Sequence, residues 1–159
     1  MRVGLDELDI RILERLLKDS RKSLRSIAKE LGTPTSTVHE RVKRLVKIGI
    51  IKRFTAELDT KILGMDVTAL ILISVEGAYI TEVERALSSY EQVVAVYDIT
   101  GEFDVAVIAK FRSIDELNNF IKNVLKIPHV KRTVTSVVFN VVKEKLCIDS
   151  PRPAIALKG

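Results

Sequence analysis

Apolar residues recur every three or four positions through the first third of the chain, and this spacing predicts three helices. The first covers 6–17. The second covers 23–31, opened by a serine that suits a helix N-cap and followed by a glycine that suits a helix end. The third begins within 33–35 and ends at Gly49. Because a Gly-Thr-Pro break separates the last two helices, residues 23–42 show the pattern typical of a helix-turn-helix.

The third predicted helix has two chemically different sides. Its apolar residues follow the i, i+4, i+7, i+8 pattern of one helix face, so we expect them to pack on the first two helices. At about 100° per residue, the polar residues lie on the opposite side, which is left for a partner. The apolar side consists of Val38, Val42, Leu45 and Val46. The polar side consists of Ser36, Thr37, Glu40, Lys43, Arg44 and Lys47, with Arg41 beside them.

Beyond the third helix the pattern changes to that of extended backbone. Residues 50–58, Ile-Ile-Lys-Arg-Phe-Thr-Ala-Glu-Leu, predict a strand or a small hairpin. Such a wing makes residues 1–58 a winged helix-turn-helix DNA-binding domain. We assign residues 59–66 to a linker.

The second half of the chain predicts strand, helix, strand, strand, helix and strand in that order. This is the order of a ferredoxin-like domain, a four-stranded antiparallel sheet with both helices on one face, so the fold class is α+β. We assign it to 67–146, and 147–159 to a tail without a motif. The six elements are expected at 67–75, 80–90, 93–99, 105–111, 114–125 and 134–142.

Two of these strands contain runs of consecutive apolar residues. In 70–73 (Leu-Ile-Leu-Ile) and 105–108 (Val-Ala-Val-Ile), residues of both strand faces are apolar, although the helices cover one face of the sheet. An exposed apolar face of this size marks an interaction site. We therefore expect the other face to pack on a second subunit and give a homodimer.

The net positive charge is confined to the first predicted domain. Residues 1–58 carry 14 Lys or Arg against 8 Asp or Glu, whereas 59–159 carry 12 against 13, and the whole chain has a formal net charge of +5. Basic residues that coincide with a helix-turn-helix indicate contact with double-stranded DNA. Contacts with the DNA backbone, which fix register without specifying sequence, are expected from Arg25, Lys43, Lys47, Lys52 and Arg53.

Arg41 and Arg44 are the candidates for contact inside the major groove, since a guanidinium pairs with guanine or clamps a phosphate. The alternative is a salt bridge with Glu40 or another neighbour. Ser36 and Thr37 lie in the first turn, which points at base edges, although hydroxyls there also act as caps. Glu40 can accept from a cytosine amine or reject wrong sequences.

The composition argues against several other classes of protein. Cys147 has no partner in the chain, which excludes an intrachain disulfide framework and favours a reducing, cytoplasmic compartment. The charged N-terminus does not resemble a signal peptide, and the apolar runs are too short to span a membrane. No metal-ligand spacing, glycine-rich phosphate loop or Ser/His/Asp set occurs, so no metal or cofactor is expected.

Five short motifs occur in a specific order and spacing. The first half contains Leu5-Asp6-x-x-Asp9-x-x-Ile12-Leu13, then Gly32-x-x-x-Ser36-Thr37-Val38-x-x-Arg41-Val42-x-Arg44-Leu45, then Gly49-Ile50-Ile51. The second half contains Leu63-Gly64 and Thr100-Gly101-x-x-Asp104. Together they resemble the Lrp/AsnC family, the leucine-responsive or feast/famine transcription regulators, along nearly the full chain.

Two positions depart from the pattern of that family. Pro34 stands where the family usually has a serine that opens the recognition helix, so we expect Thr33 or Thr35 to supply the cap. Pro128-His129 stands where the family usually has Pro-Gly before the last strand. The glycine that permits an unusual backbone angle is therefore absent from that turn.

The resemblance implies that the second domain binds an amino acid or a similar small effector, where dimers meet in an octameric ring. In this interpretation Glu102 or Asp104 meets the ammonium, and Gly101 leaves backbone N–H groups open to the carboxylate. The effector site implied in this way comprises Thr100, Gly101, Glu102, Phe103 and Asp104, with Thr133, Thr135 and Ser136 as added hydroxyls.

The leading hypothesis is a sequence-specific transcriptional regulator whose DNA binding or assembly responds to an amino acid. One alternative is a sirohaem decarboxylase-like enzyme of the same fold, although its second domain would have His129 as its sole imidazole. The other is an effector-independent architectural protein, which would bind random DNA uniformly.

Overall fold

The computed structural model describes residues 4–145, which form two compact units. The first ends at Glu57 and the second spans Leu58–Lys143. The predicted tail of residues 147–159, with Cys147, lies outside the described residues. In the described part, no helix is both long and apolar enough to cross a membrane.

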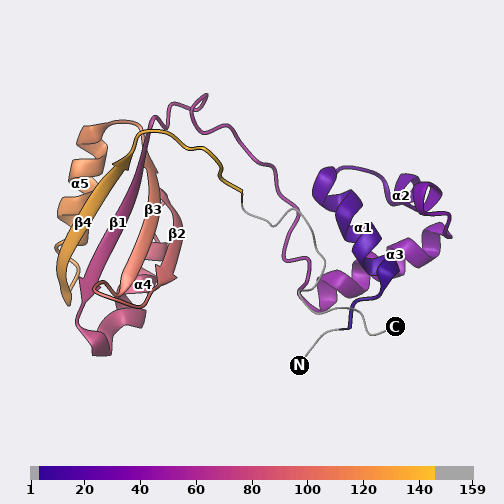
Figure 1. Ribbon diagram of the computed structural model, residues 1–159, viewed down its shortest axis with the longest axis horizontal. Helices are drawn as coiled ribbons and strands as arrows, with labels where there is room; N and C mark the ends of the chain where they lie inside the picture. Colours follow the sequence, from indigo (N-terminus) through magenta and orange to yellow (C-terminus); the bar gives the residue numbers. More distant parts are fainter. Residues whose placement is uncertain (1–3, 146–159) are drawn as a thin grey trace. The chain divides into compact units, whose positions relative to one another are not determined.

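The first unit contains the three predicted helices (Figure 1): α1 (Glu7–Lys18), α2 (Leu24–Leu31) and α3 (Thr35–Lys47). Their apolar sides meet in one core, as the helical periodicity predicted. Val46 was expected to pack in this core, but its side chain is 45% exposed, so the prediction is wrong for that residue. The core consists of Ile12, Leu16, Ile27, Ala28, Val38 and Val42, with Leu8, Leu24, Leu31 and Ile51 packed against it.

The helix ends differ in how they are capped. Ser23 caps α2 by accepting from the N–H of Ser26 at 3.2 Å, and Gly32 ends that helix with a φ of 63°. Pro34 occupies the N-cap of α3, and no side chain accepts a hydrogen bond there. The expectation that Thr33 or Thr35 would cap α3 is therefore wrong. Because proline fills the cap position with no acceptor on its side chain, the first-turn N–H groups of α3 are left for another partner.

Residues 50–58 do not form the expected strand or hairpin. The segment is extended, and within the described residues it is paired with no strand. One backbone bond ties its start to α3, from the N–H of Ile51 to the carbonyl of Leu45 at 3.1 Å. Extended backbone becomes a strand when a second edge satisfies its N–H and C=O groups, and the described residues of this unit supply none. Phe54 and Leu58 remain 54% and 64% exposed.

The second unit is the predicted antiparallel sheet with two helices. The strands lie in the order β2-β3-β1-β4, which with the intervening helices is the βαββαβ arrangement of a ferredoxin-like fold. The last strand is displaced from its expected 134–142, because it pairs with β1 along 130–138. The elements are β1 (Val67–Val75), a short 3-10 helix η1 (Gly77–Tyr79), α4 (Ile80–Ser88), β2 (Val93–Asp98), β3 (Val105–Phe111), α5 (Ile114–Val124) and β4 (Val130–Val138).

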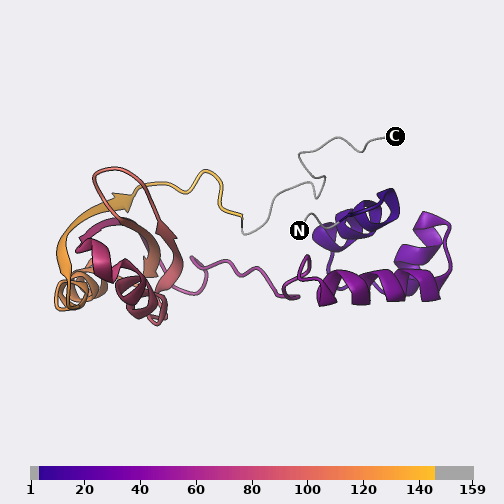
Figure 2. The same ribbon diagram turned by 90° about the horizontal axis from the view of Figure 1, so that it is seen from below.

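Both helices cover the same face of this sheet (Figure 2), and the core lies between them and the strands. Aromatic rings fill its centre, where Phe120 of α5 contacts Phe111 and Tyr90 with ring centroids 5.1 Å apart in each pair. Alternate residues of the central strands point into this core. These include Ala69, Ile71, Ile73 and Val75 of β1, and Val105, Val107, Ala109 and Phe111 of β3.

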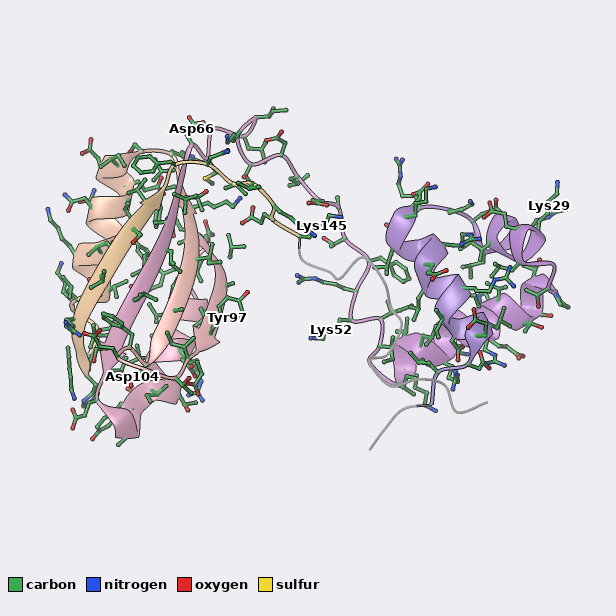
Figure 3. The ribbon with its side chains drawn as sticks, viewed as in Figure 1. Lys29, Lys52, Asp66, Tyr97, Asp104 and Lys145 are labelled. Carbon is green, nitrogen blue, oxygen red and sulfur yellow. The ribbon has the colours of Figure 1, made fainter. Side chains whose placement is uncertain are left out.

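Among the described residues no helix lies on the opposite face of the sheet (Figure 2), and the central positions of this face are apolar. Leu70 pairs with Ile108, and Leu72 pairs with Ala106 and Val134 in the neighbouring strands. Tyr97 projects from β2, opposite Ala106 (Figure 3). The exposed fractions of Leu70, Tyr97 and Val134 are 38%, 53% and 43%, so a substantial apolar surface faces outward.

Candidate nucleic-acid interface

The polar side of α3 forms one exposed stripe. Ser36, Glu40, Lys43 and Lys47 follow an i, i+4, i+7, i+11 spacing, and all four are exposed. They lie opposite the buried apolar side, as predicted. The stripe therefore presents a hydroxyl, a carboxylate and two ammonium groups along one line, a set that meets both base edges and phosphates.

A shallow hollow of about 540 Å³ lies beside the N-terminus of α3. It is bounded by the start of α2 and by the turn between α2 and α3. Arg25 and Lys29, both exposed, stand one helical turn apart on its α2 side, and Figure 3 shows Lys29 pointing away from the helix. Hydroxyls of Ser23, Ser26, Thr33 and Thr35 complete its polar lining. Two cations and several hydroxyls beside an uncapped helix N-terminus suit a phosphate of the DNA backbone.

The two arginines of α3 do not share the exposure of the stripe, because both are paired with carboxylates at the start of α1. Arg41 Nη1 contacts Asp6 Oδ2 and lies 3.3 Å from Asp9 Oδ1. Arg44 Nη2 contacts Asp9 Oδ2. Both arginines therefore form salt bridges, which was the alternative to DNA contact. Their partners lie at the start of α1 and do not include Glu40. Sequence spacing gave no signal for these partners, which stand more than thirty residues away.

The two aspartates also cap α1. Asp6 accepts from the N–H of Asp9 at 2.9 Å, and Asp9 accepts from the N–H of Asp6 at 3.1 Å. This reciprocal pair is a capping box built from two carboxylates. Burial raises the pKa of Asp6, but the backbone N–H of Asp9 and the guanidinium of Arg41 outweigh it and lower that pKa overall. Asp6 in turn raises the pKa of Arg41.

Lys52 and Arg53, the last two predicted phosphate contacts, lie in the extended segment that follows α3. Both are exposed. Figure 3 shows Lys52 projecting from this segment. They add positive charge beyond the C-terminal end of the stripe.

In the second unit, the predicted ligand turn lies between β2 and β3. Gly101 has a φ of 122°, a backbone angle that favours glycine. Asp104 fastens the turn to β1, because its Oδ2 accepts from the N–H of Val75 at 2.7 Å and from the Ser74 hydroxyl at 3.4 Å. Figure 3 shows Asp104 at this end of the sheet. Its carboxylate therefore has a structural partner.

Arg132 of β4 joins this turn and is a residue that the sequence pattern did not single out. Its Nη2 contacts Glu102 Oε1, and its guanidinium lies 4.8 Å from the ring centroid of Phe103. The strand pairing brings it there, opposite Ser74. Lys131 and Arg132 are neighbouring cations in the sequence, and nothing in their pattern indicates that only Arg132 makes this contact.

The three predicted hydroxyls of β4 do not converge. Thr133 and Thr135 pair with Ile73 and Ile71, which point into the core, whereas Ser136 pairs with Leu70 on the helix-free face. Adjacent positions on a strand point to opposite faces, which divides the set. Residues 4–145 also contain no group of three His, Cys, Asp or Glu side chains placed to hold a metal ion.

A helix-turn-helix with an exposed polar third helix, followed by a ferredoxin-like domain, defines a DNA-binding regulator with a second, ligand-binding domain. Residues 5–52 match a family described as winged helix-turn-helix DNA-binding, and residues 68–146 match the Lrp/AsnC ligand binding domain. The matching family is described as winged, although residues 50–58, where a wing was expected, form no strand within the described residues.

Individual relatives cover most of the chain. The uncharacterized HTH-type transcriptional regulator PH1692 of Pyrococcus horikoshii is 48% identical over 140 residues, which are 88% of this chain and 95% of the relative. The HTH-type transcriptional regulator FL11 of the same organism is 40% identical over 144 residues, 91% of this chain and 95% of FL11. The structure of E. coli AsnC has a TM-score of 0.86 at 28% identity, covering 92% of this chain and 99% of AsnC.

The chain belongs to the Lrp/AsnC family of HTH-type transcriptional regulators. This confirms the resemblance drawn from its motifs. It also decides against the decarboxylase alternative, because the relatives are DNA-binding regulators and not enzymes.

Proposed function

We propose that this regulator recognises its operator through the exposed stripe of α3 and the adjoining hollow. Ser36, Thr37 and Glu40 read base edges in the major groove, while Lys43 and Lys47 contact phosphates on its flanks. Arg25, Lys52 and Arg53 extend the phosphate contacts to either side. The observation that carries this assignment is the line of exposed polar side chains on α3, opposite its buried side.

Selection of bound fragments from random duplex DNA tests this proposal. We expect enrichment of a palindrome whose half-sites lie about one helical turn, ~10 bp, apart or a multiple of it. Substitution of Glu40 by Gln should then change the preferred base at one position of each half-site. Uniform binding without an enriched site would favour the architectural alternative instead.

The helix-free sheet face is the surface that brings two copies together. Leu70, Leu72, Tyr97, Ile108 and Val134 make it apolar and in part exposed, and a C2 dimer buries the same patch of both subunits. Dimerisation supplies the paired recognition helices that a palindromic site requires. Assembly of dimers into an octamer is the further step that the family resemblance implies.

A regulator of chromosomal DNA with this architecture acts in the cytoplasm.

The effector is an amino acid or a similar small molecule bound near the turn of residues 100–104. The match of residues 68–146 to a ligand binding domain supports this role, and a protein of this fold, the regulator NMB0573 from Neisseria meningitidis, was solved as a complex with L-Met. Glu102 meets an ammonium, and Arg132 beside it meets a carboxylate. Asp104 and Thr100 serve the shape of the site, whereas Thr133, Thr135 and Ser136 do not converge on it and are left out of the proposal.

Isothermal titration with the twenty amino acids singly tests the effector role. We expect one or a few to bind, and to shift either the assembly state or the operator affinity, because an effector must prefer one of two states. Arg132→Gln should weaken binding, while Lys131→Gln, one residue away and exposed, should not. Absence of binding by all twenty amino acids would refute the proposal of an amino-acid effector.

A further inference from the structure

Asp9 is fully buried, and among residues 4–145 it is the only polar or charged residue that is. It lies in α1, outside the helix-turn-helix, yet both arginines of the recognition helix converge on it. Asp6, one helical turn earlier, holds Arg41 from the more exposed side. Two carboxylates and two guanidiniums therefore form one cluster between α1 and α3.

This cluster removes positive charge from the DNA-facing surface. Its two positive and two negative groups cancel, whereas Lys43 and Lys47 of the neighbouring stripe are exposed and form no salt bridge within residues 4–145. Arg44 Nε is buried and finds no hydrogen-bond acceptor among the described residues, so the guanidinium is held by its pairing with Asp9 rather than by a full set of bonds. The guanidiniums are nevertheless close to the surface, since the side chains of Arg41 and Arg44 are 32% and 41% exposed.

We propose that Asp6 and Asp9 are specificity-determining residues, which occupy Arg41 and Arg44 and keep them from contacting DNA phosphates. An arginine beside the major groove would otherwise bind any sequence, because phosphates are everywhere alike. With both arginines held, recognition depends on the hydroxyls, the carboxylate and the lysines of the stripe. This inference rests on the proposed DNA-reading role of α3 and goes beyond it by assigning α1 carboxylates a part in selectivity.

Asp6→Asn is the variant that tests this, since asparagine caps a helix as well as aspartate does and the substitution removes only the charge. Glu7→Gln is the matched control: it lies in the same first turn, is exposed, and changes the net charge equally. Affinity for a random-sequence duplex and for the selected operator is measured over a series of KCl concentrations, with a thermal unfolding curve for each variant.

We expect Asp6→Asn to bind the random duplex more tightly than Glu7→Gln does. Its plot of log affinity against log salt should steepen by about 0.9, the value of one added phosphate contact. The ratio of operator to random affinity should fall. Adding Arg41→Gln to Asp6→Asn should return the slope to that of Arg41→Gln alone, because the freed guanidinium causes the change.

Equal slopes for Asp6→Asn and Glu7→Gln would overturn the inference, as would a steeper slope that persists without Arg41. A wild-type protein that binds neither duplex would instead contradict the proposed role of α3. The two failures are thus distinguishable in the same titrations.

Discussion

The imidazole of His129 is stacked on the ring of Tyr79, with ring centroids 3.4 Å apart and planes 3° from parallel. His129 also has a φ of 71°, and among the described residues it is the only non-glycine residue with a positive φ. This is the turn where the family usually has glycine. Stacking on Tyr79 and the contact of Nδ1 with Glu76 Oε2 at 3.1 Å help to hold a backbone angle that histidine rarely adopts.

Two substitutions of His129 separate the stabilisation by stacking from the cost of the positive φ. His129→Ala keeps the positive φ but loses the stacking, which is worth about 0.5–1.5 kcal/mol, so we expect a loss of stability of about that size. His129→Gly also loses the stacking but relieves a backbone cost of roughly 1–2 kcal/mol, so it should be more stable than the alanine variant. Urea unfolding measures both. An alanine variant at least as stable as the glycine variant would contradict this account.

Lys43 and Lys47 are expected to contribute phosphate contacts that do not depend on sequence. Replacing either by Gln should reduce the slope of log affinity against log salt by about 0.9, and should weaken operator and random duplex alike. Lys122→Gln, on an exposed position of α5 in the second unit, is the control and should leave the slope unchanged. A loss confined to the operator would show instead that the lysine reads a base.

Asp104 is expected to hold the turn of residues 100–104 against β1. Asp104→Ala leaves the Val75 N–H without its acceptor, so we expect a loss of about 1–3 kcal/mol in stability. Hydrogen exchange is the specific measurement, since protection of the Val75 amide should fall while that of the β1–β3 ladder remains. Asp98→Ala, an exposed aspartate at the end of β2, is the control. Unchanged exchange at Val75 would refute the role.

The helix-free sheet face predicts how the protein associates. Leu70→Lys places a charge at the centre of that face, and we expect the proposed dimer to dissociate because burying an unpaired ammonium is costly. Leu125→Lys, at a leucine at the end of α5 that is more exposed than Leu70, should leave the proposed dimer intact. Sedimentation velocity distinguishes the two. If both variants dissociate, or if neither does, the helix-free sheet face is not the dimer interface.

Glu116 gives the second unit a defined response to acid. The backbone N–H of Arg112, at 2.8 Å from Oε2, and the amide of Gln92 lower its pKa from the ordinary 4.5. A lowered pKa in the folded state stabilises the fold above the unfolded value, and this contribution is lost as the pH falls through the folded pKa. We therefore expect Glu116→Gln to lose less stability than wild type as the pH falls below the ordinary pKa of 4.5. Glu82→Gln, exposed on α4, should follow the wild-type curve.

Most of the secondary structure followed from the sequence, because it rests on local rules. Helical spacing predicted α1, α2 and α3, Ser23 and Gly32 marked the ends of α2, and the apolar runs marked β1 and β3. The errors fell where pairing decides the outcome. Residues 50–58 have the composition of a strand, but the described part of their unit offers no strand to pair with. The strand β4 begins at Val130 because it pairs with β1 there.

The polar side of α3 was likewise determined by the sequence alone, since a periodicity of about 100° per residue places Ser36, Glu40, Lys43 and Lys47 on one line. Only the tertiary structure decided the fate of Arg41 and Arg44. Their partners, Asp6 and Asp9, lie at the start of another helix. A buried carboxylate needs a cation beside it, and only the packing of the helices decides which cations are close enough. The position of Arg132 was also decided by the tertiary structure, because the pairing of β4 with β1 places it beside Glu102 in the turn of residues 100–104.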